Sequence, residues 1–480
     1  MQTYLFENEQ IIVQKTATNE REKLLLKYNN KLRTNRSLSR QLVSFQDNKR
    51  IPFYRWLKFK EGFSSNLVKY LLTHYKNTSH NHTKPWNILD PFAGAGTTVT
   101  TAIEEGNIST GIELLPVGIA AMKARLISAS VSLEEFIKYF EKYQDYSKSS
   151  NEKSKYQFPH LKITEHAFSE ETERSLAHFM AFLEEIPLEN IRFLFWFACL
   201  SILEEISYTS KDGQYLRWDH RSGRSLKSKY IKNNISSFHD AILRKLELIS
   251  YDLKRSGQTF NYSKKATIIE GSCLEELPRM MANQYDLVIT SPPYCNRYDY
   301  TRTYALELAF IGYDEKKIKK LRQSLLSATV ENRTKEEYLY KNYLELQRLD
   351  FFENVMNSFK SQKALQEVLK LLTEARDRKE LNNNNIPNMV SNYFLELNFV
   401  IHELSRVLRP GGRVYMVNDN VQYAGEEIPV DLILSDFAEH SGLKVNEIWI
   451  LPRGKGNSSQ QMGTFGRREI RKCIYIWQKI

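Results

Sequence analysis

The segment NILDPFAGAGTT, residues 87–98, decides how the rest of this 480-residue sequence is interpreted. Its first part is an apolar run with the length of a buried strand, and its second part is a glycine-rich turn followed by a helical pattern. Glycines in such a turn let the backbone approach a ligand closely, and the start of the next helix offers free amide donors. The segment lacks both the GxGxxG and the GxxxxGK(S/T) phosphate loops. We expect a ligand-binding turn, although a dinucleotide site or a tight structural turn would use a similar pattern.

Six further segments have the apolar, β-branched or aromatic character of strands. Together with residues 87–92, the runs at 109–114, 266–271, 285–291 and 412–418 alternate with helical patterns, which is typical of a parallel α/β sheet. The last two runs, at 444–451 and 470–477, are close enough to form a terminal antiparallel pair. The sequence therefore predicts an α/β fold with a mixed sheet of seven strands.

Two long excursions interrupt this pattern, one of about 150 residues and one of about 110, and both are rich in helical periodicity. Excursions of this length are substructures and not loops. In the first, residues 191–206 indicate a buried helix, and in the second, residues 360–379 indicate an amphipathic helix ending near the asparagine run at 382–385. The expected division is an N-terminal extension (1–50), a catalytic core (51–125 with 260–312 and 395–480), a helical insertion that is a candidate target-recognition region (126–259) and a second helical insertion (313–394).

The composition is that of an ordinary globular protein, with 41% hydrophobic and 26% charged residues. No apolar run reaches the length of a membrane span, and the acidic first residues argue against a secretory signal, so we expect a cytoplasmic protein. The four cysteines form no CxxC pair, which indicates neither a metal site nor disulfides. A net charge of +11 favours a polyanionic partner, although many soluble proteins are as basic.

An acidic residue follows the glycine-rich turn at the spacing of a ribose-binding site. The second strand ends at Glu113 in GIELLP, about 20 residues after the turn, where a carboxylate can accept both hydroxyl groups of a ribose. A solvated carboxylate at a strand end is the alternative. Adenosine binding is favoured.

The fourth strand leads into TSPPY, Thr290–Tyr294. Its two prolines fix the backbone and remove two amide donors, which leaves carbonyl groups free to accept a hydrogen bond from an exocyclic amine. Tyr294 offers a flat face on which an extruded base can stack. Alone, TSPPY would be read as a turn that ends a strand. Its order after the glycine-rich turn and Glu113 favours a catalytic role.

DPFAGAGTT, GIELLP and TSPPY together resemble the cofactor, ribose and catalytic motifs of the amino-methylating DNA methyltransferases. Weaker similarities lie at 271–278, where that family contacts an adenine ring, at 58–72, which resembles the helix near the methionine end of the cofactor, and at 407–420, a turn and strand common to class I methyltransferases. The resemblance covers roughly half of the chain and excludes both insertions. It implies a class I, Rossmann-like S-adenosylmethionine-dependent methyltransferase fold with two mainly helical insertions.

The same resemblance assigns roles to individual residues. It implies that S-adenosylmethionine is held by Asp90, Phe92, Ala93, Gly94, Gly96, Thr97, Thr98, Glu113, Ser272 and Cys273, and that Ser291, Pro292, Pro293 and Tyr294 are catalytic. Serine at position 291 resembles the cytosine-N4 subgroup more than the adenine-N6 subgroup. Either a hydroxyl group or a carboxylate there would accept an N–H bond from the attacking amine, so this chemistry does not by itself identify the base.

Cys295 does not have the placement of the nucleophile used in cytosine-C5 methylation. That nucleophile directly follows a proline, whereas here Tyr294 intervenes. We expect a packing role for Cys295 and no covalent enzyme–base intermediate.

Basic and aromatic residues alternate in the segment 208–230. Lys211, Arg217, Arg221 and Arg224, together with Lys227 and Lys229, are interleaved with Tyr215 and Trp218, a pattern that suits phosphate contact and base stacking but also a charged surface hairpin. Its position between the ribose and adenine motifs is not a common place for a target-recognition region in the family. Arg297 and Arg302, just after the catalytic motif, are further candidates for holding DNA. In the basic stretch 451–472, Ser458, Ser459 and Gln460 would contact DNA or cap a hairpin.

The expected function is site-specific methylation of cytosine N4 in duplex DNA, in restriction–modification or phage defence, with a cognate restriction endonuclease as a candidate partner. The alternatives are adenine-N6 methylation of DNA, amino-group methylation of RNA, and nucleic-acid binding without catalysis. We expect no metal and no membrane partner.

Overall fold

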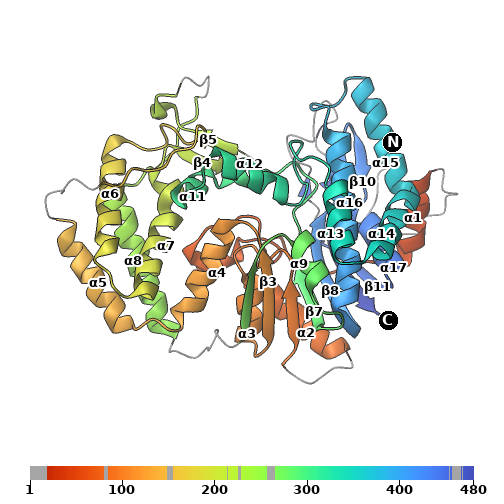
Figure 1. Ribbon diagram of the computed structural model, residues 1–480, viewed down its shortest axis with the longest axis horizontal. Coiled ribbons are helices and arrows are strands. Elements are labelled where there is room, and N and C mark those ends of the chain that lie inside the picture. Colours follow the sequence, from red (N-terminus) through yellow and green to blue (C-terminus); the bar gives the residue numbers. More distant parts are fainter. Residues whose placement is uncertain are drawn as a thin grey trace.

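The computed structural model describes residues 19–79, 85–148, 155–212, 215–224, 229–256, 265–452, 455–456, 466 and 469–480. Its centre is an eight-stranded sheet in the order β1-β11-β14-β8-β7-β2-β3-β6 (Figure 1). These strands are β1 (Leu32–Thr34), β2 (Asn87–Asp90), β3 (Ile108–Glu113), β6 (Ala266–Glu270), β7 (Tyr285–Thr290), β8 (Leu408–Asp419), β11 (Leu443–Ile450) and β14 (Lys472–Lys479).

The α/β fold expected from the sequence is confirmed. All seven predicted segments are strands of the sheet, and β14 runs antiparallel to both of its neighbours, β8 and β11, while the other pairs are parallel. The predicted count of seven is short by one, because β1 adds an edge strand parallel to β11. β1 is only three residues long and carries no period-2 pattern that sequence analysis could detect. It lies within residues 1–50, so this part of the chain also contributes to the sheet.

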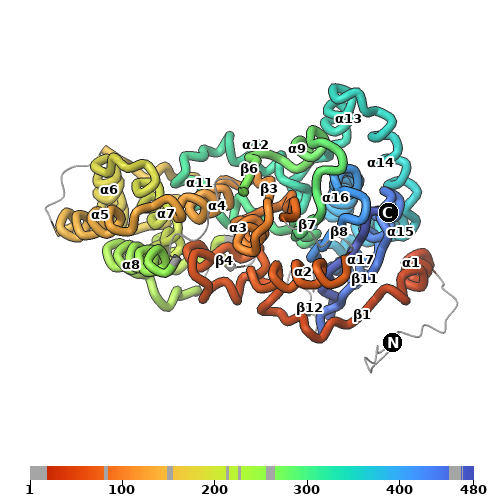
Figure 2. The backbone as a smooth tube through the Cα atoms, turned by 90° about the horizontal axis from the view of Figure 1, so that it is seen from below, coloured from red at the N-terminus to blue at the C-terminus, as the bar shows by residue number. Residues whose placement is uncertain are grey.

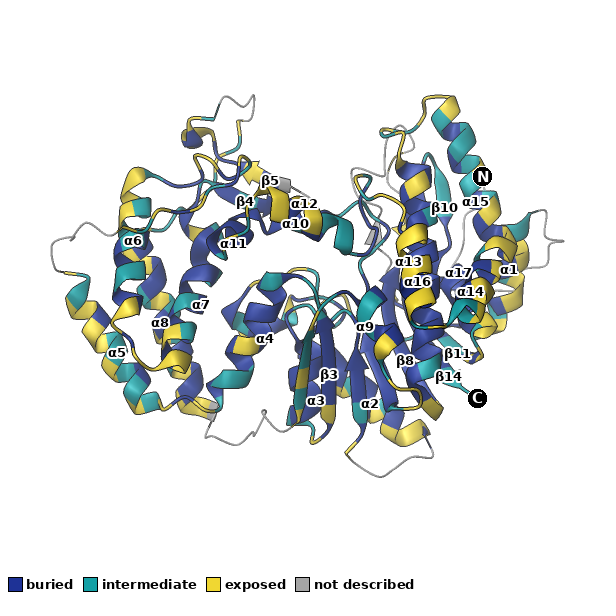
Figure 3. Cartoon of the chain, in the orientation of Figure 1, coloured by how far each residue is buried: buried dark blue, intermediate teal, exposed yellow. Residues whose placement is uncertain are grey.

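The sheet is covered on both faces, which explains why its strands have continuous apolar runs and no alternation. Ile88 and Leu287 pack with α2 (Ser65–Thr78) on one face. Leu89 and Val288 point to the other face, in the same core as α16 (Ile386–Val407). Figure 3 shows the central strands of the sheet in dark blue, and β7 is buried along its whole length. The carboxyl ends of β2, β3 and β7 are thereby held rigidly side by side.

The first insertion forms a helical lobe beyond the β6 edge of the sheet (Figures 1 and 2). It contains α5 (Leu133–Tyr146), α6 (Glu170–Glu184), α7 (Glu189–Ile206), α8 (Phe238–Ser256) and a hairpin of β4 (Thr209–Asp212) and β5 (Tyr215–Trp218). The lobe has its own core, in which Phe179, Phe195 and Leu200 are fully buried. The helix predicted at 191–206 is α7, and it is buried as expected.

The second insertion begins with α12 (Glu315–Ser324) and continues through α13 (Glu336–Glu345), α14 (Leu349–Ser361) and α15 (Lys363–Asp377). The helix predicted at 360–379 is α15, which begins at Lys363 because Gln362 caps it by accepting a hydrogen bond from the backbone N–H of Leu365 at 2.9 Å. Residues 360 and 361 end α14 instead. The asparagine run at 382–385 lies between α15 and α16, as expected of a loop. In Figure 2, α13–α15 lie at the opposite end of the molecule from α5, α6 and α8.

The remaining elements connect these parts. They are the helices α1 (Glu20–Tyr28), α3 (Thr97–Glu104), α4 (Pro116–Ser128), α9 (Cys273–Arg279), α10 (Tyr300–Thr303), α11 (Ala305–Phe310) and α17 (Val430–His440), the 3-10 turns η1 (Asn29–Lys31), η2 (Asp47–Arg50), η3 (Tyr54–Trp56) and η4 (His220–Ser222), and the short strands β9 (Val421–Tyr423), β10 (Glu426–Ile428), β12 (Lys455–Gly456) and β13 (Glu469–Ile470). Within the described ranges, no helix is both long and apolar enough to cross a membrane.

Candidate active site

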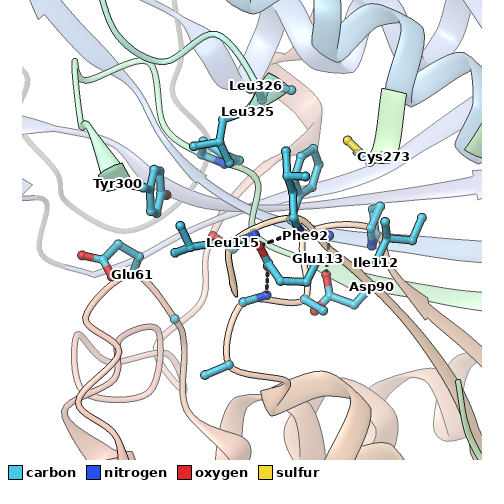
Figure 4. Close-up of a pocket in the computed structure, with 18 of the residues that line it drawn as sticks. Glu61, Asp90, Phe92, Ile112, Glu113, Leu115, Cys273, Tyr300, Leu325 and Leu326 are labelled. Atoms are coloured by element: carbon cyan, nitrogen blue, oxygen red, sulfur yellow. Dashed lines mark hydrogen bonds between the residues drawn. The ribbon is translucent and has the colours of Figure 1, made fainter. Parts of the chain in front are cut away.

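A pocket with an empty volume of about 870 Å³, its open mouth included, lies at the carboxyl ends of β2 and β3 (Figure 4). Its walls come from the glycine-rich turn after β2, the end of β3, the start of α9 and the segment after β7. Segments 59–63 and 324–326 complete it from two other parts of the chain. The pocket therefore joins motifs that are separated by up to about 200 residues in sequence.

Glycine is required at three places around the turn after β2. Gly94 and Gly96 have positive φ values of 54° and 76°, which other residues rarely adopt. A Cβ atom on Gly94 would lie 3.0 Å from the ring of Phe59, and one on Gly96 would overlap the side chain of Met122. On the adjacent helix α4, a Cβ atom on Gly118 would lie 2.5 Å from the carbonyl oxygen of Gly94. The turn is thus closely packed from both sides, with its backbone facing the pocket.

Glu113 connects the end of β3 to this turn. Its carboxylate accepts backbone N–H bonds from Gly94 at 2.5 Å, from Leu114 at 2.9 Å and from Leu115 at 2.6 Å (Figure 4). Burial raises the pKa of Glu113 to about 7, although the three N–H donors act in the opposite direction. A carboxylate that titrates near neutral pH therefore lies in the pocket wall.

Asp90 connects β2 to the neighbouring strand β7. Its Oδ1 accepts hydrogen bonds from Thr290 Oγ1 at 2.7 Å and from the backbone N–H of Phe92 at 3.1 Å. Burial raises the pKa of Asp90 to about 6. These bonds fix the start of the glycine-rich turn relative to the start of TSPPY.

Most of the residues predicted to bind the cofactor line one pocket. They are Asp90, Phe92, Ala93, Gly94, Thr97, Glu113, Ser272 and Cys273. Gly96 and Thr98 are not in the pocket lining. Gly96 packs against Met122, and Thr98 donates from Oγ1 to the carbonyl oxygen of Ile289 at 3.2 Å, so both hold the turn in place from behind.

Of the four predicted catalytic residues, Ser291 and Pro293 line the pocket. Pro292 is buried, and Tyr294 is not in the pocket lining but contacts Ser291. Ser291 Oγ donates to the carbonyl oxygen of Val417 at 3.1 Å and lies 3.3 Å from the hydroxyl group of Tyr294. The TSPPY segment is therefore bonded to β8, the next strand of the sheet.

Lys472 was not singled out by sequence analysis, yet it contacts Tyr294. Its Nζ donates to the Tyr294 hydroxyl group at 3.3 Å, lies 5.1 Å from the centre of the Tyr294 ring, and pairs with Asp419 at 3.1 Å. Lys472 and Asp419 face each other across β14 and β8. Strand pairing brings these two residues together, so no local sequence pattern predicts their contact.

Several other residues that line the pocket were also not predicted individually from the sequence. Glu61 lines the pocket, and its carboxylate accepts hydrogen bonds from the hydroxyl groups of Tyr298 and Tyr304. The resemblance at 58–72 predicts that this segment lies near a cofactor, but no sequence motif distinguishes Glu61 within it. Leu325 and Leu326 line the opposite wall, as Figure 4 shows, and their sequence has no distinguishing signal.

Cys295 is completely buried, and burial raises the pKa of its thiol well above the usual range. Such a thiol stays protonated at neutral pH. Among the described residues, no group of three or more His, Cys, Asp or Glu side chains could hold a metal ion.

Lys211 does not lie where a DNA phosphate could reach it, and this corrects its assignment as a surface contact. Its side chain is 3% exposed, its Nζ pairs with the buried carboxylate of Glu307, and it lies 4.2 Å from the centre of the Tyr304 ring. Removing one partner of such a buried pair leaves an uncompensated charge. Lys211 therefore anchors the β4–β5 hairpin to α11.

The other basic residues predicted to bind DNA are more accessible, but each has a partner within the protein. Arg217 and Arg224 stack on Tyr230 and Trp218, at 4.3 Å and 4.4 Å from the ring centres. Arg221 bonds to the carboxylate of Asp219 through Nε at 2.7 Å and Nη2 at 2.9 Å. These contacts pre-order the guanidinium groups around the hairpin.

After TSPPY, Arg297 Nη1 donates to Asn382 Oδ1 at 2.8 Å, and Arg302 pairs with Glu331 and with Asp299. Lys227 and the stretch containing Ser458, Ser459 and Gln460 lie outside the described residues.

Comparison with known proteins identifies the family. No protein-family model matches the chain. Over 463 residues it is 46% identical to the proteins named type II methyltransferase M.AvaI from Nostoc sp. and from Anabaena variabilis, with 94% of this chain and 92% of each relative covered. It is 40% identical over 476 residues to type II methyltransferase M.BsoBI from Geobacillus stearothermophilus, with 96% and 92% covered. Together with an α/β fold that carries its pocket at the strand ends, this similarity shows that the chain belongs to the type II DNA methyltransferases.

Proposed function

We propose that this protein transfers the methyl group of S-adenosylmethionine to the N4 amino group of a cytosine in duplex DNA, as the modification enzyme of a restriction–modification system. The observation that carries the proposal is one pocket shared by Glu113, the glycine-rich turn and the Ser291–Pro293 segment. In the proposed scheme, a ribose acceptor and a set of amine acceptors would lie on two walls of the same space. A cognate endonuclease is the partner that such a system implies.

The residues of the pocket fit S-adenosylmethionine. Phe92, Ile112 and Leu326 supply apolar surface for an adenine ring, and Glu113 supplies a carboxylate for ribose hydroxyl groups. Gly94 leaves the space that any side chain would fill. When bound, the cofactor supplies an electrophilic methyl group on a sulfonium.

Ser291 is suited to accept a hydrogen bond from the target amine. Its single hydroxyl proton is directed to the carbonyl oxygen of Val417 and toward the Tyr294 hydroxyl group, so lone pairs on Oγ remain for an incoming N–H. With the carbonyl group of Pro292, Ser291 would hold the amine so that its nitrogen lone pair faces the methyl group. Tyr294 would stack on the base extruded from the duplex.

Lys472 acts in this scheme as a positioning residue. Its donor bond and its place over the ring both restrain Tyr294, and Asp419 neutralises its charge. Neutralisation matters because positive charge develops on the amine during transfer, and an unpaired lysine would oppose it. Tyr294 is thereby oriented before the base arrives.

The nature of the methylated base provides the direct test. Duplex DNA and total RNA are incubated with the protein and methyl-labelled S-adenosylmethionine, digested to nucleosides and analysed by mass spectrometry. We expect N4-methylcytosine from DNA and no labelled nucleoside from RNA. N6-methyladenine would overturn the assignment of the base, which depends on Ser291, whereas 5-methylcytosine would overturn the mechanism, because the protonated Cys295 thiol is no nucleophile.

Cofactor affinity is expected to rise about tenfold between pH 6 and pH 8. Because the pKa of Glu113 is raised to about 7, its carboxyl group is mostly protonated at pH 6 and mostly ionised at pH 8. In the ionised form Oε2, which among the described residues accepts only the N–H of Gly94, can also accept a ribose hydroxyl group. Titration calorimetry at several pH values measures the effect.

Glu113→Gln is the control for this pH dependence, because its amide does not titrate in this range. It should bind more weakly and lose most of the tenfold change, and what remains reports Asp90 and the amino group of the cofactor itself. A variant with the same pH profile as the wild type would show that Glu113 is not the titrating group.

A further inference from the structure

Helix α12 presents a face of lysines to solvent. Lys316, Lys317, Lys319 and Lys320 are all exposed, whereas Ile318 and Leu321 are buried in the core of the first lobe. With 3.6 residues per turn, the four lysines share one side of the helix and the two apolar residues share the other. The charged face is therefore fixed in orientation by the packing of the helix.

These lysines have no carboxylate partners among the residues that the structure describes. Lys317 Nζ donates to the carbonyl oxygen of Gly312 at 3.1 Å, and the nearby carboxylate of Glu315 accepts the backbone N–H of Lys162. By contrast, Lys138 and Lys142 on α5 are paired with Glu135 and Glu185. Like charges four residues apart destabilise a helix, so uncompensated lysines at 316 and 320 disfavour α12 until an anion neutralises them.

The position of α12 relates this face to the active site. The short helix α10, which follows the catalytic segment, contacts both β5 and α12. Arg322, in the last turn of α12, bonds through Nε to Asp299 at 3.0 Å and to Thr301 Oγ1 at 3.1 Å. Figure 1 shows α12 beside the β4–β5 hairpin, on the side of the sheet where the strands end at the pocket. The lysine face thus belongs to an element anchored to the catalytic segment.

The end of α12 also leads directly into the pocket wall. Ser324, Leu325 and Leu326 line the pocket, and Ser272 Oγ donates to the carbonyl oxygen of Ser324 at 3.4 Å. Among the described residues of the second insertion, only these three line this pocket. A polyanion held on α12 is consequently held at a fixed position relative to the site of methyl transfer.

We propose that the lysine face of α12 binds the sugar–phosphate backbone of duplex DNA. The inference rests on the proposed function, in which duplex DNA is the substrate, and it assigns a role to the first helix of the second insertion. Phosphates are the anions that a substrate duplex presents at regular spacing, and lysine is a sequence-independent phosphate contact. α12 would position the duplex while other elements read its sequence.

The test compares two double variants, Lys316→Gln/Lys320→Gln on α12 and Lys138→Gln/Lys142→Gln on α5. Each removes two positive charges spaced four residues apart on an exposed helix face, so the change in net charge is identical. Binding of a fluorescent mixed-sequence duplex is measured by anisotropy over a range of salt concentrations. The slope of log K against log salt is negative, and its magnitude should decrease by about 1.8 in the α12 variant, because each lost phosphate contact removes about 0.9. In the α5 variant the slope should remain near the wild-type value.

Cofactor affinity and thermal unfolding serve as checks on folding. Cofactor affinity should match the wild type in both variants, and both should unfold in a cooperative transition, because all four side chains are exposed. The melting temperature of the α12 variant should not fall, since its two lysines repel each other. An α12 variant with the wild-type slope overturns the proposal, and so does an equal loss in both variants, which would reflect net charge alone. A different result would contradict the proposed function, namely that the wild-type protein does not methylate duplex DNA.

Discussion

Tyr294→Ala should lower turnover by about 100-fold or more while S-adenosylmethionine binds with nearly unchanged affinity. Loss of base stacking removes about 1 to 3 kcal/mol, and loss of alignment in the transfer step adds to this. Cofactor affinity is spared because the Tyr294 side chain is not part of the pocket lining. Single-turnover methylation and titration calorimetry of the same preparation measure the two quantities.

Tyr294→Phe separates stacking from hydrogen bonding. It keeps the ring but removes the hydroxyl group that Lys472 and Ser291 contact. We expect a smaller loss of turnover than with alanine, because the flat face remains and only its restraint is weakened. Equal losses in the two variants would exclude stacking as the main contribution, and a parallel fall in cofactor affinity would contradict the separation of the two sites.

The second large effect is expected for Gly94→Asp, which should weaken cofactor binding beyond detection in calorimetry. The residue has a φ of 54°, and a Cβ atom would lie 3.0 Å from the ring of Phe59. The added carboxylate would also lie beside Glu113, which bonds to the backbone N–H of Gly94, so two negative charges would share a buried site. Turnover should be lost together with binding.

Gly106→Asp is the matched control for this substitution. Gly106 also has a positive φ, of 85°, but a Cβ atom there would have nothing within 4 Å, and the residue precedes β3 at the end of the strand away from the pocket. The two variants therefore share backbone strain and added charge and differ in location. Retained binding in Gly94→Asp, or equal loss in Gly106→Asp, would refute the placement of the cofactor site.

The parts of the fold and of the site that sequence analysis predicted are those with a local signature. Buried strands appear as apolar runs, and the glycine-rich turn and TSPPY are contiguous strings whose backbone requirements restrict the residue types. Where a partner lies far away in sequence, prediction failed. Lys211 stands in a basic, aromatic segment that suggests a surface hairpin, but its partner Glu307 is 96 residues away and draws it into the interior.

The same reason accounts for the pocket residues that were missed. Leu325 and Leu326 become a pocket wall only because α12 ends there, and Lys472 reaches Tyr294 only through the pairing of β14 with β8. Such contacts depend on tertiary structure, which composition and periodicity do not encode locally.

The strand order has a consequence for how the chain acquires its structure during synthesis. β2 pairs with β7, so Ile88 can reach its partner Leu287 only after about 200 further residues have been synthesised. β14 enters the sheet between β8 and β11 only when residues 472–479 are available. Pairing over such distances must first overcome the entropy of closing long loops, which makes folding slow. The first lobe has a core drawn mainly from residues 115–253 and can form earlier on the ribosome. A nascent chain will therefore carry most of the helical lobe, still without α11 and α12, before residues 472–479 complete the sheet. Active protein will lag behind completed synthesis by the time needed to close the sheet.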